Sequence, residues 1–380
     1  MPDPRVTPAV HSSRVIFIDL GRALAVIFML YGHTASALLA AEYQSGRWFA
    51  IWQFQRGLTS SLFLLLGGFA FSVATSKHWP SHIRWSPSIV KRLRRFGLFV
   101  LLGYALHVPV TRLADLGSVP DDRWRTFIAV DVLQLVGVTL VLVQFLVMAS
   151  RSRRLFTVVA LVLALLTIFL TPVMWRADWT FLPSFLAAYF SPAVGSLFPL
   201  FPWMAFVLLG AGFGQLFARW GPARQPEFAR LALLAPGVAM LVLSAALRAW
   251  PAPWFGTGPA SIVPAEVLTR AGACLVILAA IAYLSRRITR LPHVFGAVAQ
   301  ESLLIYFVHL CIVYGSVWNR GLSQIYGATL TPPQTLLAVA LVIVSMVGLA
   351  WYWNWWKHVR PRAARWMSFA AGGLLLYKLL

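Results

Sequence analysis

The chain has 380 residues, of which 59% are hydrophobic and 11% are charged, and its formal net charge is +21. This composition excludes an ordinary soluble domain, in which about a quarter of the residues are charged. It predicts an all-α protein whose helices cross a membrane several times. The two cysteines, Cys274 and Cys311, both lie in apolar stretches. They predict neither a disulfide framework nor a metal site.

Apolar stretches of about 20 residues, the length that crosses a bilayer, recur along the chain. They predict a bundle of ten transmembrane helices within residues 15–356, after a tail of residues 1–14 and before a basic, interfacial segment at 357–380. The expected spans are residues 15–40, 49–74, 96–113, 126–148, 155–175, 199–217, 231–249, 265–284, 297–317 and 335–356. The stretch 366–380 is short for a span, so it forms either an interfacial segment or a marginal eleventh helix.

Basic residues are distributed unevenly between the two sides of this bundle. With the N-terminus in the cytoplasm, 22 of the 32 Lys and Arg residues fall on the cytoplasmic side, 7 on the opposite side and 3 within spans. Such an excess is typical of cytoplasmic loops in helical membrane proteins. We therefore expect both termini in the cytoplasm, a location in the inner or plasma membrane, and contacts of the basic loops with membrane lipids rather than nucleic acid.

The first expected span carries Arg22 and His33 eleven residues apart. Eleven residues bring a helix back to nearly the same face, about 16 Å farther along its axis. An ionisable group in the bilayer costs about 2.5 to 3.5 kcal/mol, so such residues usually face a bundle interior and mark a site. Asp19 lies on the same face and can pair with Arg22. A plain buried ion pair and a packing histidine are the structural alternatives.

Other spans place polar residues at matching depths. Those expected to form an outer polar layer are His33, Arg56, Asp131 and Arg270. Those expected to gather on the cytoplasmic side, near Glu301, are Asp19, Arg22, Lys91, Arg92, Arg94 and Arg95. Between the two layers, Ser302, Tyr306 and His309 share one face of the ninth span and form a polar lining. For His309 a structural role is the alternative to a catalytic one.

Five segments, in order along the chain, resemble the membrane acyltransferase superfamily that holds the heparan-alpha-glucosaminide N-acetyltransferase-like proteins and the acyltransferase-3 family. They are RVIFIDLGRALAVIFMLYGHT, RGLTSSLFLLLGGFAFSVA, VDVLQLVGVTLVL, FPLFPWMAFVLLGAGFG and ESLLIYFVHL. The family's Arg and His fall on Arg22 and His33, its second-helix Arg on Arg56, and its late Tyr and His on Tyr306 and His309. Two departures are Gly21, which precedes Arg22 instead of following it, and Gln134, which replaces a common His.

The resemblance implies transfer of an acyl group, usually acetyl from acetyl-CoA, to a hydroxyl or amine of a glycan or other small envelope compound. The residues fit this chemistry independently, because the imidazole of His33 can act as a base or as an acyl carrier near neutral pH. Arg56 or Arg270 at the same depth would stabilise an oxyanion. The basic cluster at 91–95 would bind the phosphates of acyl-CoA, which is a co-substrate rather than a bound cofactor.

Two other classes of protein have similar features. A membrane transporter or lipid flippase also has buried Arg, Asp and His residues, but it needs a substrate path open to both faces and no CoA. A non-enzymatic scaffold would keep its function after the polar stripe was replaced by apolar residues. Binding or hydrolysis of acetyl-CoA by the purified protein separates an acyltransferase from both.

The charge asymmetry makes the topology testable with reporter fusions. Fusions after Gly46 and after Asp178 should report a location outside the cytoplasm, and fusions after Ser152 and Arg287 a location inside it. Reversal of any of these reporters would overturn the assignment of residues to depths in the membrane.

Overall fold

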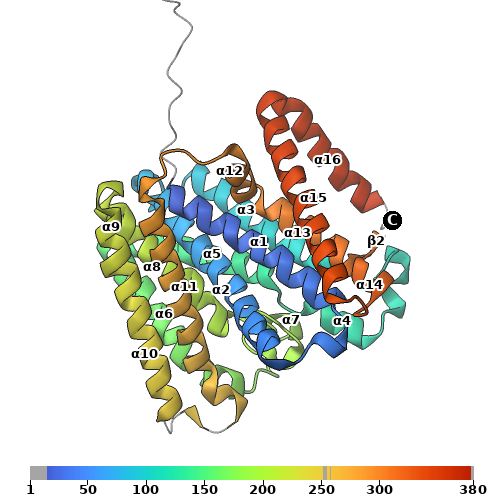
Figure 1. Cartoon of the computed structure of the whole chain (residues 1–380), viewed down its shortest axis with the longest axis horizontal. Helices are drawn as coiled ribbons and strands as arrows, with labels where there is room; N and C mark the ends of the chain where they lie inside the picture. Colours follow the sequence, from blue (N-terminus) through green and yellow to red (C-terminus); the bar gives the residue numbers. More distant parts are fainter. Residues whose placement is uncertain (1–14, 251–254, 257, 378–380) are drawn as a thin grey trace, which may run out of the picture.

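The computed structural model describes residues 15–250, 255–256 and 258–377, and these residues form an almost entirely helical bundle (Figure 1). The expected tail, residues 1–14, lies outside the described residues. The helices are α1 Ile16–Leu38, α2 Gly46–Lys77, α3 Pro87–Leu106, α4 Asp121–Ile128, α5 Val132–Ser150, α6 Arg153–Arg176, α7 Ser184–Ala187, α8 Leu200–Trp220, α9 Gln225–Phe228, α10 Ala235–Ala249, α11 Val263–Leu284, α12 His293–Gln300, α13 Ser302–Tyr314, α14 Leu322–Tyr326, α15 Pro332–Val359 and α16 Pro361–Tyr377. A π-helical segment, Ala229–Leu234, joins α9 to α10, and the strands β1 Gly315–Ser316 and β2 Asn319–Arg320 pair antiparallel.

Within the described part of the chain, eight helical runs are long and apolar enough to cross a membrane. They are α1, α2, α5, α6, α8, the run Pro222–Ala249 that contains α10, the run Pro259–Arg287 that contains α11, and α15. These runs coincide with eight of the ten expected spans. The expected fold class, an all-α polytopic bundle, is confirmed.

Three of the expected spans differ in detail from the observed helices. The third begins earlier, because Ser86 caps α3 and Pro87 occupies its first turn, so α3 contains the basic cluster in its first half. The fourth is interrupted, since α4 ends at Ile128 and the side chain of Asp131 caps α5. The ninth is broken at Glu301, where α12 and α13 meet at an angle of 73°.

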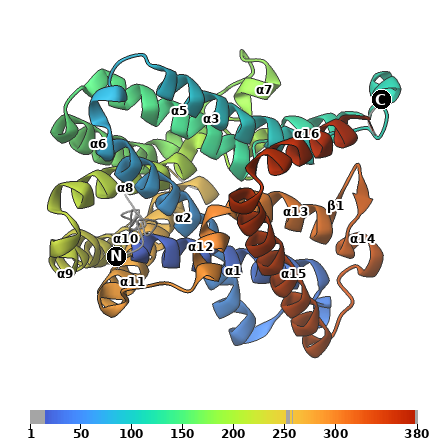
Figure 2. The same cartoon turned by 90° about the horizontal axis from the view of Figure 1, so that it is seen from above.

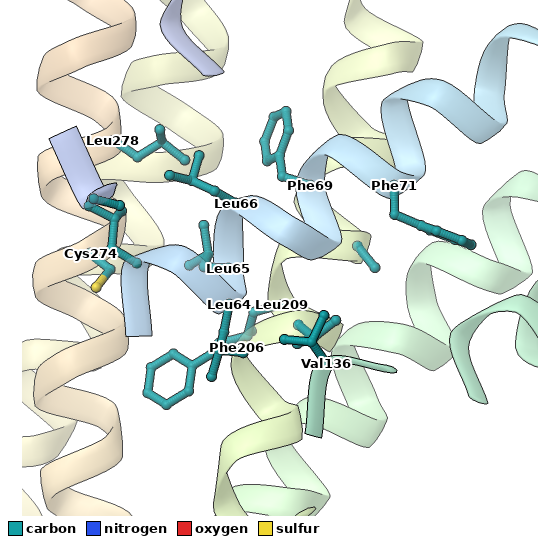
Figure 3. Close-up of a cluster of buried hydrophobic side chains, with 14 of the residues drawn as sticks. Leu64, Leu65, Leu66, Phe69, Phe71, Val136, Phe206, Leu209, Cys274 and Leu278 are labelled. Carbon is teal, nitrogen blue, oxygen red and sulfur yellow. The ribbon is translucent and has the colours of Figure 1, made fainter. Parts of the chain in front are cut away.

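The core is organised around α2 and α8, which approach each other through glycines. A Cβ atom on Gly68 would lie 1.9 Å from the carbonyl oxygen of Val207, and one on Gly210 would lie 1.9 Å from that of Leu65. Such spacing of small residues permits close packing of membrane helices. Figure 3 shows Leu64, Leu65 and Leu66 of α2 among side chains of α8, α5 and α11. The GAGFG segment of α8 therefore serves helix packing.

The first helix occupies a central position. It packs against α2, α11, α12, α13 and α15. In Figures 1 and 2, the α9–α11 segment lies at one end of the molecule and the α13–α16 segment at the other, with α1 between them. Polar side chains on several faces of α1 can therefore meet partners from other helices.

The C-terminal segment forms a helix of its own. Helix α16 follows α15 after a break at Arg360 and has 17 residues, which corresponds to about 25 Å and is shorter than the roughly 30 Å of a hydrocarbon core. The indole Nε1 of Trp318 donates a hydrogen bond to the carbonyl oxygen of Leu375 at 3.0 Å, which ties this helix to the loop after α13.

The glycine contact between α2 and α8 gives a matched pair of variants. Gly68→Ala should lower the thermal stability of the purified protein by several degrees, because overpacking costs about 1 to 3 kcal/mol. Gly67→Ala, one residue earlier on the same helix, meets nothing within 4 Å and should leave the midpoint unchanged or raise it slightly. Equal midpoints for the two variants would contradict the close contact.

Candidate functional site

Arg22, near the cytoplasmic end of α1 in the expected topology, is the inner member of the polar stripe. Its guanidinium Nη2 donates to the hydroxyl of Ser302 at 3.3 Å, at the point where α12 ends and α13 begins. Asp19 and Arg95 are both close enough to Arg22 to interact with it electrostatically. The structure therefore brings together three of the residues expected on this side, with Ser302 from the expected lining.

Glu301 binds residues of α15 and not the basic residues that were expected near it. Its carboxylate Oε1 pairs with Lys357 at 2.5 Å and accepts a hydrogen bond from the amide of Asn354 at 2.9 Å. Both partners belong to α15. Glu301 therefore fastens the broken helix to α15 instead of meeting Arg22.

His33, the outer member of the stripe, lies in a cluster of aromatic and imidazole rings. Its Nδ1 is 3.0 Å from the hydroxyl of Tyr314, within hydrogen-bond distance. The ring centroid of His309 is 5.3 Å from that of His33, and the ring of Tyr306 is 5.6 Å from that of His309. Both Tyr306 and His309 are buried, at 4% and 0% exposure. His309, one member of the expected polar lining on α13, thus lies directly beside the ring of His33.

Asp131 connects this cluster to the loop that precedes α5. One carboxylate oxygen accepts from the backbone N–H of Val132 at 2.7 Å, and the other lies 3.4 Å from Nε2 of His107. The carboxylate is within electrostatic reach of His33 and Tyr314. Asp131 therefore adds negative charge beside the histidine, as its expected depth implied, although it caps α5 instead of lying inside a helix.

Arg56 and Arg270 approach the same region from α2 and α11. The side chain of Arg56 crosses α1 at Gly32, where an added Cβ would lie 3.0 Å from its Cγ, and its Nη1 donates to the hydroxyl of Ser36. The guanidinium of Arg270 lies beside Gly57, 3.7 Å from the position of an added Cβ, and over the ring of Trp203. The four residues of the expected outer layer thus come from four helices or their caps to one part of the bundle.

The basic cluster of α3 divides into three environments. Lys91 and Arg94 line a surface groove of about 670 Å³ together with Trp85, Ser86, Pro87 and Val90. Arg95 lies over the ring of Phe99, within electrostatic reach of Arg22, and its side chain is exposed. A ligand can therefore reach Lys91, Arg94 and Arg95.

Arg92 points into the helix interface instead. Its Nη1 donates to Thr75 at 2.8 Å and to the side chain of Gln144 at 3.3 Å, and its guanidinium lies over the ring of Phe71. Burial lowers the pKa of Arg92 to about 10, helped by the neighbouring charge of Arg95. The residue therefore stays protonated at neutral pH, and its contacts hold α3 against α2 and α5.

Tyr314 and His107 were not singled out by the sequence. Tyr314 lies five residues after His309 on α13, and a hydroxyl-bearing aromatic on the same helix was a usable signal. His107 follows the end of α3, and no sequence pattern links it to Asp131, 24 residues away. Among the described residues, no group of three or more His, Cys, Asp or Glu side chains is arranged to hold a metal ion.

Comparison with known proteins assigns the chain to a family. No curated protein sequence matches the chain. The sequence profile described as heparan-alpha-glucosaminide N-acetyltransferase, catalytic, matches residues 14–246, which contain Arg22, His33, Arg56, Asp131 and the basic cluster of α3. Arg270 and the residues of α13 lie beyond the matched region. Because the match covers more than half of the chain, the protein belongs to the heparan-alpha-glucosaminide N-acetyltransferase catalytic family, a family of membrane acetyltransferases.

Proposed function

We propose that the protein transfers an acetyl group from cytoplasmic acetyl-CoA to an amine or hydroxyl of a glycan or other envelope compound. The observation that carries the proposal is the convergence on His33 of groups suited to acyl transfer. Tyr314 bonds to its Nδ1, His309 lies beside its ring, and Asp131 and Arg56 add charges of opposite sign. Such clusters of ionisable groups are costly in a membrane and mark functional sites.

The donor would bind from the side of the basic cluster. Lys91 and Arg94 line the surface groove, and Trp85 offers an aromatic ring beside them. Phosphates suit the charge of this groove, and an adenine ring suits its indole. Arg95 and Arg22 continue the positive charge inward, with Asp19 beside Arg22. Arg92 would support this site by holding α3 in place.

The distance along α1 suits the reactive arm of the donor. Arg22 and His33 are separated by about 16 Å of helix rise, which is comparable with an extended pantetheine chain. A donor held at the basic end would thus present its thioester near His33. His33 would then act as the base that takes the acceptor's proton or as the carrier of the acyl group. Arg56 or Arg270 would stabilise the developing oxyanion.

The opposite end of the cluster is the proposed entrance for the acceptor. His107 and Asp131 are both partly exposed, with side-chain exposures of 32% and 18%. The hydroxyls of Tyr104, near the end of α3, and Tyr189, just after α7, lie 3.2 Å apart. Polar groups of this kind suit a hydroxylated or amino-bearing acceptor. The proposed topology keeps both termini in the cytoplasm and the acceptor on the other side.

Replacement of His33 tests the catalytic assignment. His33→Ala should lower kcat for acetyl transfer from acetyl-CoA to glucosamine by at least about 10²-fold, because a general base or nucleophile contributes that much. Donor affinity should be retained. The matched control is His82→Ala, since His82 is also a buried histidine but lies after α2 and away from this cluster. A well-folded His33→Ala variant with the turnover of the wild type would refute the catalytic assignment. If the unmodified protein transports a solute and does not bind acetyl-CoA, the result would favour a transporter.

The division of the basic cluster predicts different effects for its members. Lys91→Gln combined with Arg94→Gln should raise KM for acetyl-CoA about tenfold and reduce its sensitivity to salt, with kcat unchanged at saturating donor. Arg92→Gln should chiefly lower thermal stability, because it breaks two half-buried hydrogen bonds. Arg286→Gln, an exposed basic residue on the same expected side, serves as the control. An unchanged KM in the correctly inserted double variant would remove the groove from donor binding.

A further inference from the structure

Two histidines from distant parts of the chain lie beside each other in the polar cluster. His33 comes from α1 and His309 from α13, with ring centroids 5.3 Å apart and ring planes at 69°. The chemistry assigned above uses His33 alone. The surroundings of His309 indicate that the second ring also takes part.

The hydrogen bond of His309 determines which of its nitrogens is free. Nδ1 lies 2.9 Å from the carbonyl oxygen of Ile305, one helical turn earlier. A carbonyl oxygen only accepts, so Nδ1 donates and carries the proton. Nε2 of the neutral ring is then an acceptor, and it has no hydrogen-bond partner among the residues that the structure describes. Because nearly all buried polar atoms in proteins have partners, this open acceptor requires a reason.

The exposure of the two rings assigns them different positions relative to a substrate. His33 is only partly buried, whereas His309 has 0% exposure. The Nδ1 atom of His33 is occupied by Tyr314, which leaves its Nε2 for substrate. A substrate therefore meets His33, and His309 can act only through it.

We propose that His309 is a positioning residue that receives the proton of His33 during acetyl transfer. This inference rests on the proposed function. The N–H or O–H bond of the acceptor breaks and its proton moves to Nε2 of His33, while the acceptor atom bonds to the acetyl carbon and the C–S bond of the thioester breaks. The proton passes to Nε2 of His309, returns to Nε2 of His33 and is finally delivered from His33 to the sulfur of the departing CoA. His33 returns to its neutral form, and no other reagent is needed.

The charges around the pair favour one shared proton. The groups that face it are Arg56 from α2, Asp131 at the start of α5, and Tyr306 and Tyr314 from α13. Asp131 stabilises one positive charge on the two rings. Two positive charges 5.3 Å apart would repel each other, and Arg56 adds to that repulsion. The pair of rings therefore carries at most one proton beyond those of the two neutral imidazoles, which suits a relay.

Steady-state kinetics with matched histidine variants test the relay. His309→Gln should lower kcat about 10²-fold with acetyl-CoA and glucosamine, with KM for acetyl-CoA within twofold of wild type and an altered pH profile. His82→Gln is the control, because His82 is also buried and also has an unpartnered ring nitrogen, but lies outside the cluster. Added imidazole should restore part of the activity of His309→Ala. Wild-type kcat in His309→Gln, or a loss that imidazole does not rescue, would overturn the relay.

A second measurement does not depend on acetyl transfer. Diethyl pyrocarbonate acylates imidazole with loss of a proton, and mass spectrometry of the His33 peptide gives the rate. His309→Gln should slow the labelling of His33 at least tenfold, and His82→Gln should not change it. If labelling of His33 depends on His309 but the wild type neither binds nor consumes acetyl-CoA, the proposed function is wrong and proton exchange between the two histidines is supported. If the wild type turns over and His309→Gln leaves labelling unchanged, the relay fails and the function stands.

Discussion

The cost of polar side chains in hydrocarbon is the constraint on which the rest of the structure depends. Each polar group on α1 is stable in a bilayer only if another helix supplies a partner. Arg22 is bound by Ser302 of α13, His33 by Tyr314 of the same helix, and Ser36 by Arg56 of α2. The polar stripe therefore specifies which helices surround α1. The apolar packing of α2 against α8 stabilises that arrangement.

Because the chain bends at Glu301, a single helix, α13, supplies a partner to each end of the polar stripe on α1. Ser302 and Tyr314 are twelve residues apart on α13, or about 18 Å, and they bond to Arg22 and His33, which are about 16 Å apart on α1. Helix α13 thus runs alongside α1 in the same direction. The 73° bend from α12 produces this alignment, and the bonds of Glu301 to Lys357 and Asn354 hold the bend in place.

Much of the helical bundle could be predicted from the sequence, because hydropathy and helix period depend on local residues alone. The shared face of Arg22 and His33, and the shared face of Ser302, Tyr306 and His309, follow from that period. The break at Glu301 could not be predicted, because its neighbours Gln300 and Ser302 are neither Pro nor Gly, the residues that commonly mark a helix break. The same holds for the inward orientation of Arg92 and the pairing of His107 with Asp131, which depend on contacts between distant segments. These tertiary contacts decide which basic residues remain available to a ligand.

The proposed function requires the donor to enter from the basic end of the bundle and its thioester to reach His33 along α1. A structure of the protein with acetonyl-CoA, in which a methylene group between the sulfur and the carbonyl carbon prevents acetyl transfer, provides the test. The nucleotide phosphates should lie at Lys91 and Arg94, the arm beside Arg22, and the ketone oxygen within hydrogen-bond reach of the cluster around His33. A nucleotide bound at the opposite end of the bundle, or a ketone remote from His33, would contradict it.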